Sequence, residues 1–221
     1  MTTNYGCTFD ASAYGYTLDA SAARSAESIG KYIRETGKYK GKFTRAEMII
    51  SKEKGSRGIE FDFVSDGKEC TLQLWTHSGA GEPYSAINLV NAIMTCLALR
   101  GIQPKEIQVE KYDYDLKQKK TVMANCFPDL MNKPIGLLLQ KEISTYNGQD
   151  KTKMLIFAAF AHESEKTASE ILDKALQPVA LGKLVAMLAD KDSRGKGQSS
   201  GGSKSSNNQP IHDLDDDLPF N

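Results

Sequence analysis

Apolar and polar residues alternate with a period of two in the first half of the chain, which is the pattern of half-buried β-strands. In one of these runs Ile59, Phe61 and Phe63 fall on a single face, which is therefore expected to lie in the core. Asp66-Gly67, after this run, is typical of a tight hairpin turn. The three strands expected here are Phe43–Ser51, Gly58–Ser65 and Glu69–His77.

The same alternation gives the third strand an apolar face and a polar face. Leu72 and Leu74 lie on the apolar face. Thr71, Gln73 and Trp75 lie on the polar face, and Trp75 is the only tryptophan of the chain. This placement favours a surface position from which the indole stacks on a nucleic-acid base, with packing against the fold as the alternative.

Apolar residues at helical spacing predict a helix over Ala86–Leu99, which Ser85 caps and Gly101 ends. A second helical stretch over Lys166–Leu188 contains Pro178, which is expected to break it. Four further strands are expected between the two helical stretches, at Glu106–Asp115, Lys120–Phe127, Ile135–Tyr146 and Lys151–Ala161.

Three strands, a helix and further antiparallel strands predict a mainly β protein with helices, of the β or α+β class. The arrangement that fits this order best is an OB-like antiparallel β-barrel, closed or partly closed, with an inserted helix. The same list of elements also suits another α+β domain. Three segments are expected. The first is an N-terminal arm over 1–36, in which either a weak arm or a short helix around 20–35 fits the sequence. The second is the barrel domain with its C-terminal helices over 37–189, and the third is a disordered linker with an acidic tip over 190–221.

The formal net charge of zero hides an uneven distribution of charge. Nine basic residues lie between Lys31 and Arg57 against three acidic ones, whereas six acidic residues oppose four basic ones from Asp190 onward. Basic residues clustered in this way often form only a solvated face of a protein. A basic body joined to an acidic tail also fits a protein that binds a polyanion and masks its own binding surface with the tail.

Signatures of catalysis and of cofactor binding are absent from the sequence. It contains no phosphate-binding loop ending in Lys-Ser/Thr, no Gly-x-Ser-x-Gly elbow, no His-Glu-x-x-His and no acidic cluster in the body. The four cysteines are not paired at the spacing of a zinc knuckle. The sequence therefore predicts a protein that is not an enzyme and holds no metal or cofactor. With no apolar run as long as a membrane span and no secretory signal, a cytoplasmic location is expected.

Aromatic residues interleaved with basic ones suit the binding of single-stranded nucleic acid, which needs cations for phosphates and flat side chains for bases. Tyr112 and Tyr114 share a strand face, where they form either a two-base platform or a cap on the core. For Tyr39 and Phe43, packing at the barrel edge is as well supported as contact with a base. The candidate nucleic-acid-binding residues are Tyr39, Lys40, Lys42, Phe43, Arg45, Trp75, Tyr112, Tyr114, Lys117, Lys119 and Lys120.

The chain ends in an acidic run that is closed by an apolar Leu-Pro-Phe segment. The Phe220 ring suits a pocket on a partner protein, Pro219 lowers the entropy lost on docking, and the aspartates steer the tip toward a basic surface. An ordinary solubilising tail would explain the aspartates but not the apolar end. The candidate partner-binding residues are Asp213, Asp215, Asp216, Asp217, Leu218, Pro219 and Phe220.

The segment Asp215-Asp216-Asp217-Leu218-Pro219-Phe220 resembles the C-terminal tip of the single-stranded DNA-binding proteins of bacteria and their phages, with Leu218 in place of the usual isoleucine. The order of barrel, linker and tip is also similar, and the body over 37–161 resembles the divergent phage versions. The resemblance implies a protein of the bacterial host cytoplasm that coats and protects single-stranded DNA during replication, recombination and repair. It also implies that the tip recruits replication, recombination and repair proteins. In the bacterial family the phenylalanine is the last residue and partners recognise its carboxylate, whereas Asn221 follows it here.

Two other functions fit the same residues. One is a protein–protein adaptor or inhibitor whose tail occupies the pockets of host repair enzymes and whose body binds no nucleic acid. The other is a recombination mediator or strand-annealing protein, which would share the binding surface and promote pairing of complementary strands. The sequence leaves the oligomeric state open, a homo-oligomer included.

Overall fold

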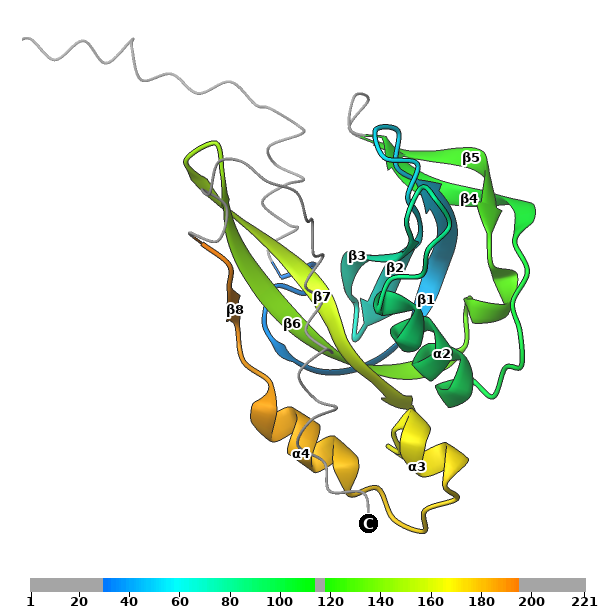
Figure 1. Cartoon of the computed structure of the whole chain (residues 1–221), viewed down its shortest axis with the longest axis vertical. Coiled ribbons are helices and arrows are strands. Elements are labelled where there is room, and N and C mark those ends of the chain that lie inside the picture. The colour runs from blue at the N-terminus through cyan, green and yellow to red at the C-terminus, as the bar shows by residue number, and fades with distance from the viewer. Residues whose placement is uncertain (1–29, 114–117, 195–221) are drawn as a thin grey trace, which may run out of the picture.

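The computed structural model describes residues 30–113 and 118–194 (Figure 1). They form a mainly antiparallel β-sheet with few helices, which confirms the expected class. The strands are β1 (Gly37–Ile50), β2 (Arg57–Ser65), β3 (Lys68–His77), β4 (Lys105–Asp113), β5 (Gln118–Cys126), β6 (Pro134–Tyr146), β7 (Gln149–Ala161) and β8 (Lys191–Asp192). The helices are α2 (Ala86–Cys96), α3 (Ala168–Leu172) and α4 (Ala180–Met187), with a 3-10 turn, η2, at Pro128–Leu130.

Strand β1 is shared between two parts of the sheet. Its first half, from Gly37 to Lys42, pairs with β6, and its second half, from Lys42 to Ile50, pairs with β2. A side chain at Gly41 would overlap the carbonyl oxygen of Val64 and would lie 2.8 Å from the ring of Phe63. Glycine at this position therefore lets β1 pass between its two partner strands.

Two tight turns set the register of the long hairpins. Asp66-Gly67 joins β2 to β3 with φ angles of 48° and 75°, and Asn147-Gly148 joins β6 to β7 with φ angles of 50° and 74°. Positive φ at both central residues is the conformation of the turn that matches the twist of a two-stranded ribbon. The hairpin predicted at Asp66-Gly67 is confirmed.

The β4–β5 hairpin joins the sheet through a single residue pair, Glu47 with Cys126. Lys105 lies opposite Cys126, yet Lys111, six residues further along β4, places its Nζ 3.0 Å from the Glu47 carboxylate. In a flat strand Lys111 would lie roughly 20 Å from Lys105. The hairpin must therefore curl back over the face of β1 that points away from the core.

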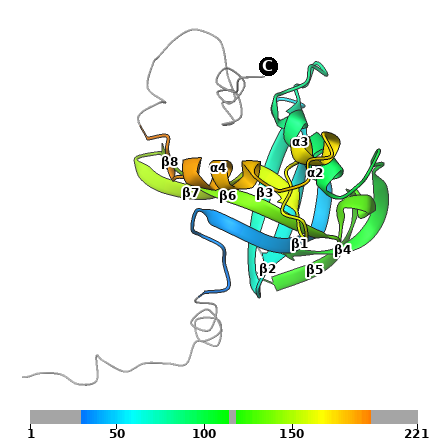
Figure 2. The same ribbon diagram turned by 90° about the horizontal axis from the view of Figure 1, so that it is seen from below.

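The sheet does not close into a barrel, which corrects the expectation of a closed one. Among the described residues the backbone pairings join β3 only to β2 and β7 only to β6, apart from isolated bridges. Helix α2 contacts both β3 and β7, and it fills the gap between the two strands with side chains rather than with a ladder of hydrogen bonds. Figure 2 shows α2, α3 and α4 along one side of the molecule and β2, β4 and β5 along the other.

The main core lies where β1, β2, β3, β6 and β7 face α2. Phe61 and Phe63, predicted to be in the core, are fully buried, and Ile59 is nearly so. A second apolar cluster, formed by Leu138, Phe157, Phe160 and Leu181, packs α4 on the opposite face of β6 and β7. The two clusters lie on the two sides of the β6–β7 hairpin and hold it in place.

The helical stretch expected over Lys166–Leu188 is broken as predicted, into the two short helices α3 and α4, with Pro178 in the connection between them. A single carboxylate joins them, because Glu170 accepts hydrogen bonds from the backbone N–H groups of Val179 (2.6 Å) and Ala180 (2.8 Å). The same residue forms a capping box with Thr167 at the start of α3.

Both ends of the body extend beyond the segments expected for it. Residues 30–36, assigned to the arm, are not helical; Ile33 is buried, and its N–H donates to the Glu69 carbonyl oxygen at 2.9 Å. At the other end, β8 pairs in parallel with β6 inside the range assigned to the linker. The remainder of the arm and the range 195–221 lie outside the described residues.

We expect Gly41→Ala to lower the free energy of unfolding by about 2 kcal/mol or more, because the added methyl group meets backbone atoms of β2 that cannot move aside. Urea denaturation measures the change. Gly101→Ala is the matched control, since a side chain at Gly101 meets no atom within 4 Å and its effect should stay within about 0.5 kcal/mol. Equal effects of the two substitutions would contradict this role of Gly41.

Candidate nucleic-acid interface

Phe43 belongs to the core. Its side chain is fully buried, and its ring centroid lies 4.5 Å from that of Phe61 and 5.8 Å from that of Phe63. A ring enclosed in this way has no free face for a base. The interpretation of Phe43 as a base contact is therefore wrong, and packing holds it in place.

Arg45 is also withdrawn from the surface. Its guanidinium is buried, donates to Asp62 and Glu60 at 2.7 Å each, and pairs closely with Glu47. Burial alone would lower the pKa of Arg45, but the hydrogen bonds to Asp62 and Glu60 outweigh it and raise the pKa. With its donors committed to carboxylates, Arg45 does not serve a phosphate.

The partners of Arg45 form a hydrogen-bonded network of three carboxylates and two cations across the outer face of β1, β2 and β3. Thr71 donates to Asp62 at 2.9 Å, Gln73 donates to Glu60 at 2.7 Å, and Lys111 donates to Glu47. The acidic residues of this face are thus satisfied within the fold. Cations for a phosphate chain must come from elsewhere on the molecule.

The other predicted residues of β1 differ in exposure. Tyr39 is half-buried and its hydroxyl donates to the Glu35 carbonyl oxygen at 2.8 Å; burial and then the Glu35 charge raise its pKa. Lys40 pairs with Glu165 at 2.8 Å, and Lys38 shares the same carboxylate. Lys42 is exposed. Of the four predicted residues between Tyr39 and Phe43, Lys42 remains the best candidate for contact with a phosphate.

Trp75 lies on the outer face of β3, as the alternation predicted, and is half-buried. Gly58 pairs directly across from it on β2 and presents no side chain against the indole. Three exposed basic residues lie nearby: Lys52 and Lys54 in the connection from β1 to β2, on either side of Glu53, and Arg57 at the start of β2. An aromatic ring with one open flank therefore lies close to a cluster of cations.

At the far end of β4 and β5, exposed Tyr112 pairs with Lys119, and Lys111 pairs with Lys120. Lys119 and Lys120 are both exposed. The predicted residues Tyr114 and Lys117 lie outside the described residues, and so do the tip residues Asp213 to Phe220. The predictions for them stay predictions.

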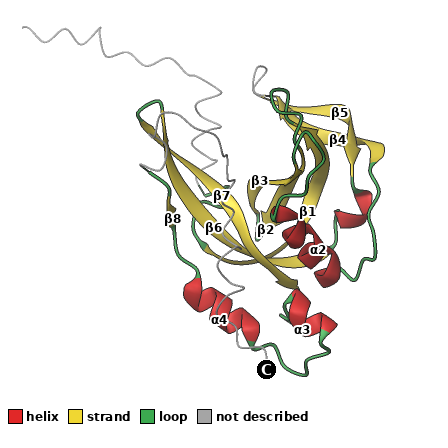
Figure 3. Cartoon of the chain, in the orientation of Figure 1, coloured by secondary structure: helices red, strands yellow, loops and turns green. Residues whose placement is uncertain are grey.

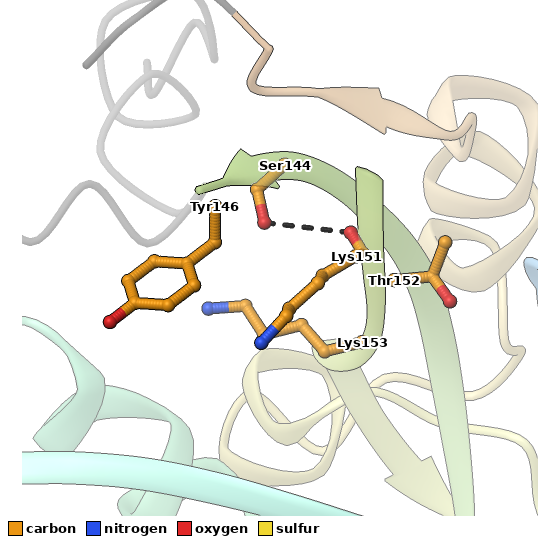
Figure 4. Close-up of a pocket in the computed structure, with 5 residues that line it drawn as sticks. All are labelled: Ser144, Tyr146, Lys151, Thr152 and Lys153. Carbon is orange, nitrogen blue, oxygen red and sulfur yellow. Dashed lines mark hydrogen bonds between the residues drawn. The ribbon is translucent and has the colours of Figure 1, made fainter. Parts of the chain in front are cut away.

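An aromatic–lysine hollow on the β6–β7 hairpin is absent from the predicted set (Figure 4). Tyr146, Lys151 and Lys153 point to the same side of the hairpin and line a hollow of about 380 Å³ with Ser144 and Thr152. The Lys151 Nζ lies 4.6 Å from the centroid of the Tyr146 ring, which is itself exposed. This arrangement offers one stacking surface and two cations, of which Lys153 is also ion-paired with Glu142 at 2.9 Å.

The register of the hairpin explains why these residues meet. Glu142 pairs with Lys153, Ser144 with Lys151, and Tyr146 with Gln149, so all six share one face. Alternation on both sides of Asn147-Gly148 is the signal in the sequence that could have found the group. Clustering of basic residues along the chain, by contrast, does not detect this group.

The candidate interface, as we define it, comprises Trp75, the β1–β2 connection with Lys52, Lys54 and Arg57, and the hollow with Tyr146, Lys151 and Lys153. Figure 1 shows the tip of the β6–β7 hairpin and the β1–β2 connection at the same end of the molecule, with α3 and α4 at the opposite end.

The same hairpin anchors β8, which precedes the tail. The buried Glu142 carboxylate accepts hydrogen bonds or ion pairs from Lys153 (2.9 Å), Lys191 (3.0 Å) and Ser193 (2.8 Å). Arg194 bridges Asp192 and Asp150, the latter at the start of β7. The described chain therefore ends beside the hairpin that carries the hollow.

Within the described residues no group of three or more His, Cys, Asp or Glu side chains is placed to hold a metal ion. Burial raises the pKa of Cys70 and of Cys96 to about 12, so both thiols are protonated at neutral pH and are poor nucleophiles. A helix long and apolar enough to cross a membrane is likewise not found in the part of the chain that the structure describes.

Comparison with known proteins finds no matching family model and no match among curated proteins. The function must therefore be argued from the geometry of the chain itself.

The Glu142 cluster predicts a defined pH dependence of stability. Burial alone would raise the pKa of Glu142, but hydrogen bonds from Lys153, Lys191 and Ser193 outweigh it and lower the pKa from 4.5 to about 2. A carboxylate with a lowered pKa stabilises the folded state above its unfolded pKa, and this contribution is lost as the pH falls through the folded value. Wild type should therefore be more stable than Glu142→Gln near neutral pH, with the difference shrinking between pH 4.5 and 2.

Urea unfolding over this pH range measures the difference. The exposed Glu106→Gln on β4 is the control and should show little difference from wild type at any pH. If the difference in free energy of unfolding between wild type and Glu142→Gln stays constant with pH, the assigned role of the carboxylate is contradicted.

Proposed function

We propose that this chain is a non-catalytic protein that binds single-stranded DNA on its candidate interface and recruits partner proteins through its C-terminal tip. The observation that carries the proposal is the aromatic–lysine hollow formed by Tyr146, Lys151 and Lys153, because base stacking beside phosphate neutralisation is what a sequence-tolerant strand binder needs. The proposed setting is the cytoplasm of a bacterial host.

The order of the elements supports an OB-like interpretation of the body. Strands β1, β2, β3, β6 and β7 would be the five barrel strands, α2 the inserted helix, and β4–β5 an additional hairpin. An OB-fold is partly open, and it binds oligonucleotides on the face of its second and third strands and on the loops after the first and fourth. Those positions correspond here to Trp75 on β3, the β1–β2 connection, and the β6–β7 hairpin.

Charge supports the same division of roles. Arg45 and Lys111 neutralise two of the three negative charges of Glu47, Glu60 and Asp62 on the outer face of β1 and β2, which reduces the repulsion toward a phosphate chain. The exposed lysines of the two hairpins supply the attraction. Each phosphate neutralised should contribute about −0.7 to the slope of log affinity against log salt, and each stacked base about 1–3 kcal/mol.

Fluorescence anisotropy with labelled oligo-dT and with a duplex of equal length tests the proposal. We expect the full chain to bind the single strand more tightly, with quenching of Trp75 fluorescence and a steep fall of affinity with salt. Tyr146→Ala and Lys151→Ala should each weaken binding, and Lys151→Ala should also reduce the salt slope by about 0.7. Lys68→Ala is the matched control, since exposed Lys68 follows the β2–β3 turn, away from the candidate interface.

Several outcomes would overturn the proposal. No Trp75 change and no salt dependence would exclude stacking at this surface. If the body binds neither oligonucleotide and the tip binds repair enzymes as an isolated peptide, the protein is the adaptor instead. Accelerated pairing of complementary strands would identify the annealing protein.

The tail should both recruit partners and compete with DNA. The described body ends beside the hollow, and 18 residues lie between Arg194 and Asp213; as the flexible linker that the sequence predicts, they would span roughly 25 Å. At that distance the acidic tip is present near the hollow at an effective concentration on the order of millimolar.

Removal of residues 213–221 should therefore leave single-strand affinity unchanged or increase it, while abolishing the capture of replication proteins in a pull-down. Anisotropy and pull-down with the same two preparations measure both effects. A marked loss of strand affinity after the deletion would contradict the competing role of the tail.

A further inference from the structure

Large apolar side chains are exposed on α3, α4 and the loop that joins them. Leu172 is 71% exposed and Leu176 is 91% exposed, and Val179, Val185 and Met187 are exposed beside them in the sequence. Together they expose on the order of 500 Å² of apolar surface, the size of the largest patch on a typical monomer and one that often has a function. We call these five residues the α3–α4 patch.

Helix α4 is apolar on both of its sides. Leu181, Leu184 and Leu188 pack inward on the second core cluster, as expected of a surface helix. Its outward side would then be expected to carry charged residues, yet Lys183 is the only charged residue between Ala180 and Met187. This composition is typical of a helix that another surface covers.

A hollow of about 180 Å³ opens next to the patch, between α2, β7, α3 and α4. Its lining includes Leu89, Phe157, Ala168 and Leu184 and is mostly apolar. Leu172 lies four residues after Ala168 on α3, so its side chain shares that side of the helix. One face of the molecule therefore carries both a protruding leucine and an apolar hollow.

We propose that the α3–α4 patch binds the same patch of a second copy of this chain and forms a twofold-symmetric dimer. Such a contact requires a surface that is complementary to itself, and a knob and a hollow on one face meet this requirement. Leu172 of each copy would enter the hollow of the other, with Leu176 and Val179 covering the rim.

Charge and area agree with a second copy as the occupant. Asp173 and Lys174 are adjacent, exposed and opposite in sign, so each can meet its counterpart across a twofold axis. The exposed apolar area of the patch, on the order of 500 Å², is more than half of the roughly 800 Å² per partner of a standard interface. Lys183, also exposed on α4, adds one positive charge beside the patch, so the acidic tip of the tail is the occupant that competes with a second copy.

The dimer leaves the candidate interface free. Figure 3 shows α3 and α4 at the end of the molecule opposite the tip of the β6–β7 hairpin. The inference does not rest on strand binding, and it is tested without nucleic acid, so the two proposals can fail separately.

Sedimentation of the full chain over roughly 1–100 μM tests the inference, since micromolar association is populated in that range. We expect a dimer for wild type, and a rise of roughly tenfold or more in its dissociation constant for Leu172→Asp and for Leu176→Asp. Both leucines are exposed, so urea midpoints should stay unchanged. Met123→Asp, at an exposed site on β5, is the matched control and should remain dimeric.

A charge exchange provides a second, independent readout. Asp173→Lys and Lys174→Asp should each weaken the dimer, and the double exchange should restore it. A monomer throughout the range, equal weakening by Met123→Asp, or a dimer that resists both leucine variants would overturn the inference. Loss of the dimer on deletion of residues 213–221 would overturn it as well, because the occupant would then be the tip.

Discussion

The pairing of one strand with two different neighbours is the constraint on which the rest of the structure depends. Because β1 pairs with β6 up to Lys42 and with β2 after it, the chain must turn there, and Gly41 leaves the space for the turn. The division sets the β6–β7 hairpin apart from β2 and β3 and leaves a core between them that α2 fills. It also directs two turns with basic residues toward one end of the molecule.

Local pattern was enough to predict most of the strands and the core face of β2, because period-two alternation and Asp-Gly or Asn-Gly turns act over a few residues. It missed β8 and the half of β1 from Gly37 to Lys42, whose pairing with β6 joins residues about 100 positions apart. Phe43 and Arg45 were misassigned for a reason that the pattern hides. A register shift between them changes the face that β1 presents, so Phe43 enters the core and Arg45 meets Asp62, 17 residues away in the chain. A cluster of charge in a sequence does not show which of its basic residues already form ion pairs within the fold.

Exposed groups of different chemistry lie at different ends of the body. Basic and aromatic side chains lie on the hairpins, apolar ones lie on α3 and α4, and the tail begins at β8 beside the hollow. Glu142 connects two of these regions, because the same carboxylate holds Lys153 of the hollow and Lys191 of β8. The surfaces that we propose for strand binding and for self-association are therefore separate, and the ion-pair cluster around Glu142 joins the first of them to β8.

In the proposed complex the strand crosses Trp75 and the aromatic–lysine hollow. Photo-cross-linking of a single strand carrying iodouracil, followed by mass spectrometry of the peptides, tests this path. We expect adducts at Trp75 and Tyr146 that unlabelled oligo-dT reduces by competition. Adducts confined to the α3–α4 patch, or none on either aromatic residue while the strand remains bound, would contradict it.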